Sequence, residues 1–153
     1  MEMMDFDIPA QADREWSHGC VSLLQESSAL NDEIDRRLDP SVDHDIYSQT
    51  AREARIRVDG ILHKWRALPR PQDPHFIEAD GLFESALTDL LASFDGLCAA
   101  CDADDEEKAE EYGKKAVALL ESYAEKFQRA GDLVSSSRLL QGNTGRLWGR
   151  LSS

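Results

Sequence analysis

The chain has 153 residues, 41% of them hydrophobic, which suits one domain whose core needs neither disulfides nor metal. It carries 30 acidic and 17 basic residues, a formal charge of −13 at pH 7. Such a charge is repelled by phosphate backbones and anionic lipid headgroups, so we expect no nucleic-acid partner and no membrane partner.

The cysteines and the first residues of the chain favour a cytoplasmic location. There are 3 cysteines, an odd number, and the N-terminal stretch is acidic and has no apolar signal region. The longest apolar stretches fall far below the ~20 residues that a membrane-spanning helix requires. We therefore expect a protein of a reducing compartment.

Apolar residues recur at steps of three and four along four successive segments, and this spacing is typical of one buried stripe on a helix. No comparable alternation with a period of two indicates a strand. The fold class expected is therefore all-α. The four helices are predicted to cover roughly residues 11–38, 43–68, 74–101 and 105–130.

The residues between the stripes support these boundaries. Asp39-Pro40-Ser41 separates the first two helices, and Asp73 can cap the third helix with Pro74 at its first position. Gly131-Asp132 is expected to end the fourth helix. Helices of similar length joined by short connections predict an up-down-up-down four-helix bundle over residues 1–131.

The last segment, residues 132–153, differs in charge from the rest. Three arginines and one aspartate give it +2, whereas residues 1–131 sum to −15. We expect a basic C-terminal tail or a partly broken fifth helix, which docks either in cis on the acidic bundle or in trans on a partner. The candidate partner-binding residues are Leu147, Trp148, Leu151, Arg146 and Arg150.

Within this tail, the stretch GRLWGRL (145–151) resembles the short Gly- and Leu-bearing tails by which cargo proteins dock inside encapsulin shells. The resemblance covers seven residues, and Arg stands where such tails often have Ser. It carries no function over to this chain.

The stretch CAACDADDEE (98–107) has two interpretations. Cys98 and Cys101 fall on the apolar side of the third helix, and Asp104 with Glu107 has the spacing of a capping box for the fourth. The alternative is a metal site, because His44 opens the second helix at the end of the bundle where the third helix finishes. Its ligands would be Cys98, Cys101, His44 and either Asp43 or Asp45.

Asp80 breaks the apolar pattern, because it occupies a stripe position where an unpaired charge is costly to bury. We expect it either to be partly exposed, since it lies near the start of the helix, or to pair with an arginine such as Arg66, and the alternative is a carboxylate that contacts a ligand. The helical wheel directs His18 and His63 outward, and His75 lies in the first turn of the third helix, so exposed histidines are expected.

The same wheel directs Gly60, Gly81 and Gly96 away from the apolar stripes, although glycine destabilises a helix. Either another segment approaches closely at these glycines, or the chain tolerates the loss of helix stability.

No catalytic motif is found: the chain has no Gly-x-Ser-x-Gly, phosphate loop, dinucleotide fingerprint or His-Glu-x-x-His. The function predicted is a non-enzymatic protein-binding module, an adaptor, chaperone or inhibitor, acting through its acidic surface and the tail with Trp148. Its partner would be another protein or a second copy in a homodimer, and no cofactor is expected. The alternative is a metal- or small-ligand-binding bundle that uses Cys98, Cys101 and His44.

Overall fold

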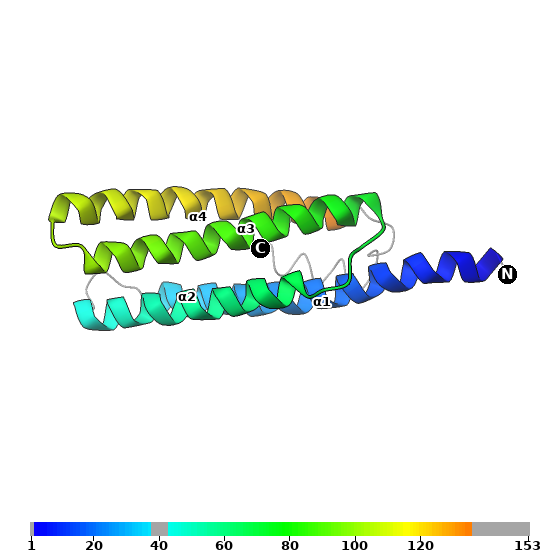
Figure 1. Ribbon diagram of the computed structural model, residues 1–153, viewed down its shortest axis with the longest axis horizontal. Coiled ribbons are helices and arrows are strands. Elements are labelled where there is room, and N and C mark those ends of the chain that lie inside the picture. The colour runs from blue at the N-terminus through cyan, green and yellow to red at the C-terminus, as the bar shows by residue number, and fades with distance from the viewer. Residues whose placement is uncertain (1, 38–42, 136–153) are drawn as a thin grey trace.

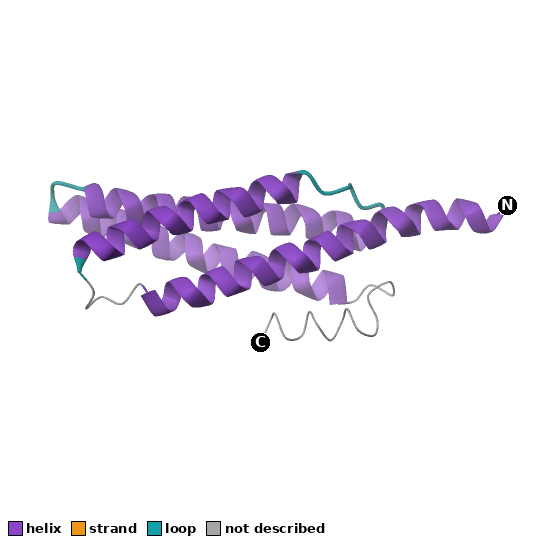
Figure 2. Ribbon diagram, turned by 90° about the horizontal axis from the view of Figure 1, so that it is seen from below, coloured by secondary structure: helices purple, strands orange, loops and turns teal. Residues whose placement is uncertain are grey.

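The protein is an all-α, up-down-up-down four-helix bundle, seen here in a computed structural model that describes residues 2–37 and 43–135, with side chains from residue 11 (Figure 1). The helices are α1 (Glu2–Arg37), α2 (His44–Arg66), α3 (Pro74–Asp102) and α4 (Glu106–Ser135). Within those ranges there is no strand, as Figure 2 makes plain. Nor does any helix there have a stretch long and apolar enough to cross a membrane. The predicted fifth helix falls outside the described residues.

Two helix boundaries differ clearly from those predicted. α1 begins at Glu2 rather than near residue 11, and its first turns project beyond the other helices (Figure 1). α4 continues through Gly131 to Ser135. Because Ala130, Gly131 and Val134 are all buried, packing offsets the ~1 kcal/mol that a helical glycine costs, and the helix does not stop there.

Aspartates cap three of the helices. The Asp73 carboxylate accepts the backbone N–H of His75 at 2.9 Å, and Pro74 follows as the first helical residue, which confirms the prediction. Asp43 caps α2 by accepting the N–H of Asp45 at 2.8 Å. The cap predicted at Asp104 is wrong, because α4 begins one residue later and Asp105 accepts the N–H of Glu107 at 2.9 Å.

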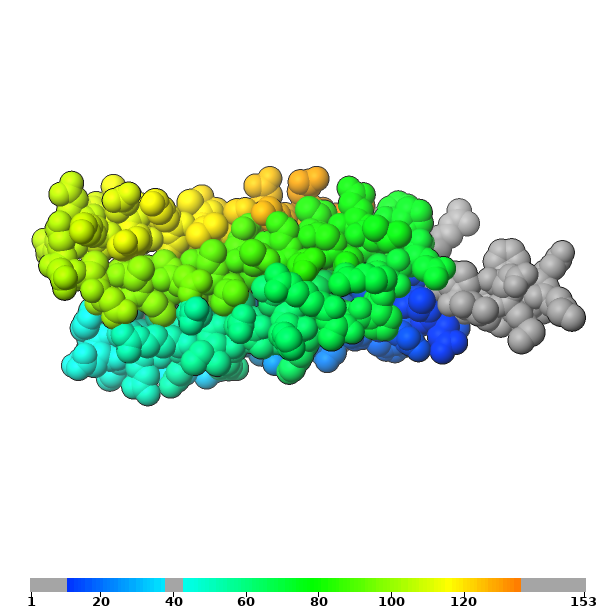
Figure 3. All heavy atoms as spheres, in the orientation of Figure 1, coloured from blue at the N-terminus to red at the C-terminus, as the bar shows by residue number. Residues whose placement is uncertain are grey.

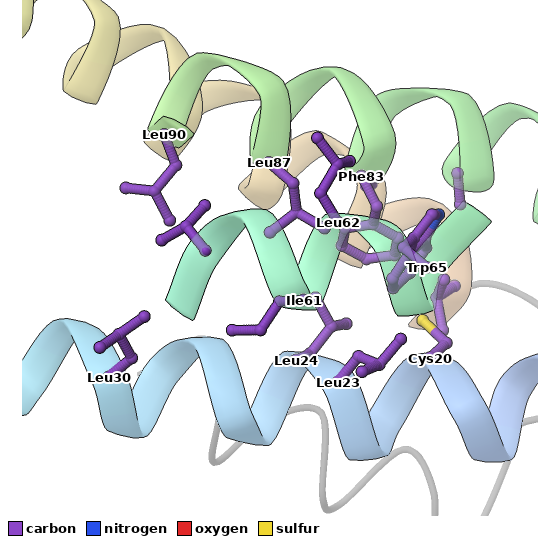
Figure 4. Packing of buried hydrophobic residues seen from close by; sticks show 14 of the residues in the cluster. Cys20, Leu23, Leu24, Leu30, Ile61, Leu62, Trp65, Phe83, Leu87 and Leu90 are labelled. Atoms are coloured by element: carbon purple, nitrogen blue, oxygen red, sulfur yellow. The ribbon is translucent and has the colours of Figure 1, made fainter. Parts of the chain in front are cut away.

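The core is one cluster drawn mainly from α1, α2 and α3, as the close view in Figure 4 shows. On the face seen in Figure 3, the side chains of α2 and α3 meet along the two helices. α4 packs most closely against α3, and its large side chains Leu120, Tyr123 and Phe127 are only half-buried. α1 and α4 approach each other much less closely than the other neighbouring helices do.

A chain of aromatic contacts links all four helices. Its ring centroids lie 4.9 to 6.2 Å apart, within the range in which tilted and edge-to-face pairs are favourable. In order, the rings belong to Phe76, Trp16, Trp65, Phe83, Phe127 and Tyr123. The chain runs from the start of α3 through α1 and α2, back to α3, and on to α4, so the aromatic residues fix the relative positions of the helices.

The glycines differ in what surrounds them. A Cβ added at Gly60 or Gly81 meets nothing within 4 Å. No close packing requires glycine at these two positions, so the chain tolerates the loss of helix stability that glycine causes there. A Cβ at Gly96 would lie 3.3 Å from the Ala116 Cβ and 3.4 Å from the Tyr112 carbonyl oxygen. Of the two readings that the sequence left open for Gly96, close approach by another segment is the one found, because this glycine allows the close approach of α3 and α4.

These surroundings predict opposite effects of substitution. Gly60→Ala and Gly81→Ala should each raise the free energy of unfolding by about 0.5–1 kcal/mol, since alanine favours the helix and meets no neighbour. Gly96→Leu should lower it by about 1–3 kcal/mol through overpacking. Urea denaturation followed by tryptophan fluorescence measures all three, and a Gly96→Leu variant as stable as the parent would contradict the close approach.

Candidate functional site

Asp80 is the centre of a hydrogen-bonded junction between α1, α2 and α3. Its side chain is 11% exposed, and its Oδ1 accepts the indole N–H of Trp16 at 2.8 Å and that of Trp65 at 3.1 Å. Its Oδ2 accepts from Arg70 Nη1 at 2.9 Å. The predicted pairing with an arginine is confirmed, but the partner is Arg70 and not Arg66, whose Nε donates to Glu84 at 2.9 Å.

This arrangement explains why an acid stands on the apolar stripe. Both carboxylate oxygens of Asp80 have donors from the chain itself, as a buried polar group requires. Burial, together with the negative charge of Asp80, raises the pKa of the neighbouring Cys20 thiol, which therefore stays protonated at neutral pH. The Asp80 site thus holds the fold together rather than presenting a carboxylate to a ligand.

A second buried carboxylate, Asp13, supports the same end of the bundle. It accepts the backbone N–H of Gln72 at 2.6 Å and that of Asp73 at 3.1 Å, and so ties α1 to the α2–α3 connection. The sequence could have indicated that Asp13 is buried. Asp13 stands three residues before Trp16 and therefore on the same face of the helix.

At the opposite end, the residues of the alternative metal site are only partly brought together. His44 and Cys101 line one hollow of about 450 Å³ with the acidic α3–α4 connection, but Cys98 is not among its lining residues. The Asp43 carboxylate is used as the α2 cap. In the part of the chain that the structure describes, no group of three or more His, Cys, Asp or Glu residues is placed to hold a metal ion.

The two thiols at this end are also disfavoured as nucleophiles. Burial raises the pKa of Cys98 and that of Cys101, and at Cys101 a hydrogen bond with Ser48 partly offsets the rise. The thiolate is the form that attacks a disulfide, so both shifts disfavour thiol–disulfide exchange at neutral pH. His18, His63 and His75 are exposed, as predicted.

The candidate binding site lies instead along the seam of α1 and α4, where two hollows of about 310 and 250 Å³ adjoin. Both are lined by Asn31, Tyr123 and Ala124, so they lie side by side along one surface, which we name the α1–α4 groove. The larger hollow also has Ile34, Asp35, Phe94, Leu97 and Leu120 in its wall, and the smaller has Ser28, Asp32, Phe127 and Gln128.

Tyr123 crosses the groove from α4 to α1. Its hydroxyl accepts from Asn31 Nδ2 at 2.9 Å and lies 3.4 Å from the Ser27 Oγ. Burial raises the pKa of Tyr123, so the phenol remains neutral. A neutral polar bridge thus separates two recesses: the one beside Leu120 is mainly apolar, and the one beside Phe127 is about equally polar and apolar.

The groove combines an apolar floor with an acidic rim. Asp32 and Asp35 are exposed on the α1 side, and the residues that line the two hollows include no lysine or arginine. Periodicity predicts the apolar stripe on α4 but not the groove. Leu120 and Ala124, which widen the stripe toward α1, are the signal that such a surface exists.

The predicted partner-binding residues Leu147, Trp148, Leu151, Arg146 and Arg150 lie outside the described residues. Comparison of the chain with protein-family models, curated proteins and solved structures finds no match. The residues of the groove themselves are therefore the basis for a functional proposal.

Proposed function

We propose that this protein is a cytoplasmic, non-enzymatic protein-binding module of the adaptor, chaperone or inhibitor type. In this proposal, the α1–α4 groove takes up a basic amphipathic helix from a partner protein. The observation that carries the proposal is an apolar groove with an acidic rim, located where two neighbouring helices of the bundle are least closely packed. An amphipathic helix that lays its apolar face into a hydrophobic groove is a recurrent mode of recognition.

The dimensions of the groove suit about two turns of a docked helix. On α1 the lining runs from Ser28 to Asp35, and on α4 from Leu120 to Gln128, which is about 10–12 Å along each helix axis. Two apolar anchors spaced three or four residues apart on the partner would enter the recesses beside Leu120 and Phe127.

The charge of the rim determines the kind of helix that fits. Asp32 and Asp35 favour lysine or arginine flanking the anchors, and the chain as a whole attracts basic partners through its charge of −13. Electrostatic steering of this kind increases the association rate most at low ionic strength. Acidic helices are correspondingly disfavoured.

Binding of a model peptide tests this proposal. The probe is a fluorescein-labelled peptide of leucine and lysine, with leucines three and four residues apart, and fluorescence anisotropy gives its Kd. Leu120→Arg should weaken binding at least about tenfold, because it places a cation in the floor of the groove. Ile56→Arg adds the same charge at a site on α2 that is 68% exposed, and should leave the Kd nearly unchanged.

A second variant avoids any effect on the core. Asp32→Asn combined with Asp35→Asn alters only exposed rim side chains, so the fold is expected to persist while the Kd for the lysine peptide rises several-fold at low salt. Equal weakening by Leu120→Arg and Ile56→Arg would mean that overall charge controls binding, and the proposed site would be wrong. The same conclusion would follow if a peptide with glutamate in place of lysine bound equally well.

A further inference from the structure

We propose that, when no partner is bound, the chain's own residues 136–153 occupy the α1–α4 groove and compete with the partner for it. The inference rests on the proposed function of the groove and adds its regulation: the bundle would carry its own competing ligand. Three properties support this assignment, namely the reach of the segment, its composition and its covalent attachment beside the groove.

The segment is long enough to reach both recesses. The described part of α4 ends at Ser135, and the nearer hollow is lined by Phe127 and Gln128, about 11 Å back along the helix axis. The 18 residues that follow would span up to about 60 Å if fully extended. The groove also lies on a face to which α4 itself contributes, so the chain need only reverse its direction.

The composition of the segment matches the chemistry of the groove. It contains three arginines and no acidic residue, opposite in sign to the rim formed by Asp32 and Asp35. Five large apolar side chains supply possible anchors: Leu139, Leu140, Leu147, Trp148 and Leu151. Between the two apolar groups, Gly142-Asn143-Thr144-Gly145 consists of residues that favour a reversal of the chain.

Covalent attachment makes even a weak contact effective. A tethered segment acts at an effective concentration in the millimolar range, so it competes strongly with a partner present at lower concentration. The apparent affinity of the partner is reduced by the fraction of molecules in which the groove is free. Loss of the main anchor, which we assign to Trp148, should therefore increase the affinity for a partner helix.

The test uses the full chain labelled with fluorotryptophan. Of its 3 tryptophans, Trp16 and Trp65 are fully buried and report on the core, and a Trp148→Phe variant assigns the third fluorine resonance. In the unmodified protein, the Trp148 resonance should differ from that of a synthetic peptide of residues 136–153. Leu120→Arg should move it to the peptide position, whereas Ile56→Arg should not. A Trp148 resonance already at the peptide position, or insensitive to Leu120→Arg, would overturn the inference.

Dilution distinguishes docking within one molecule from exchange between two copies. A cis contact leaves the Trp148 resonance unchanged on dilution and the protein monomeric in sedimentation velocity. If the resonance moves to the peptide position as a dimer dissociates, the occupant is the segment of a second copy and the inference is wrong.

Peptide binding separates this inference from the proposed function. Trp148→Ala should bind the leucine–lysine peptide about five- to tenfold more tightly than the parent chain. If the peptide binds in a Leu120-dependent manner while Trp148 stays at the free position, the proposed function stands and the inference falls. If Trp148 occupies the groove but even Trp148→Ala binds no peptide, the contact within the chain stands and the partner-binding function falls.

Discussion

Replacement of Asp80 by alanine is expected to lower the free energy of unfolding by about 3–5 kcal/mol, because two buried indole N–H groups lose their acceptor. Both indoles belong to fully buried tryptophans, Trp16 and Trp65, and both donate their N–H groups to the same oxygen of Asp80. The measurement is urea denaturation followed by circular dichroism and tryptophan fluorescence. The dependence of the unfolding free energy on urea concentration is fitted separately for each variant.

Two controls separate the roles of the Asp80 oxygens. Arg70→Ala removes a guanidinium whose side chain is 60% exposed, and it should cost less than about 1 kcal/mol. Asp80→Asn keeps one oxygen as an acceptor for the indoles. Its loss of stability should lie between those of Asp80→Ala and Arg70→Ala. If Asp80→Ala proves as mild as Arg70→Ala, the indole hydrogen bonds contribute little and the junction is not what holds this end of the bundle.

Phe83→Ala should be comparably severe, at about 3–5 kcal/mol, because it removes a fully buried ring from the middle of the aromatic chain. Phe83 on α3 lies 5.3 Å from the ring of Trp65 on α2 and 5.6 Å from that of Phe127 on α4. Its loss therefore leaves a cavity between three helices. The denaturation experiment used for Asp80 measures the effect.

The matched control lies on the same helix. Ile77 is 53% exposed, so Ile77→Ala should change stability by no more than about 0.5 kcal/mol. A Phe83→Ala variant that unfolds at the same urea concentration as Ile77→Ala would show that the aromatic chain collapses around the missing ring at little cost.

The helices could be predicted because burial imposes its period directly on the sequence. Trp16, Cys20 and Leu23 are all buried, in the order in which the stripe presents them. Asp80 stood out for the same reason, as an acid on an apolar stripe. Its partner could not be predicted from spacing, since Arg66 and Arg70 are one turn apart in sequence. The end of α2 at Arg66 decides that the second of them reaches Asp80.

The groove was beyond prediction because periodicity shows which face of a helix is buried but not how far apart two helices lie. Its two walls, residues 28–35 and 120–128, are far apart in the sequence and carry no shared motif. The two cysteines of CAACDADDEE show the opposite: the sequence suggested a site that the structure does not assemble. Their spacing permits a metal site, yet the Asp43 carboxylate is already committed to capping α2.

The difference between the tight α3–α4 pair and the looser α1–α4 seam also has a kinetic consequence. Only residues 103–105 connect α3 to α4, so this hairpin closes a short loop, whereas the α1–α4 seam joins segments at opposite ends of the described chain. Parts of a fold with few buried contacts also have the lowest local stability in the native state. We therefore expect the α1–α4 seam to form after the α3–α4 hairpin and to open more readily than the rest of the core.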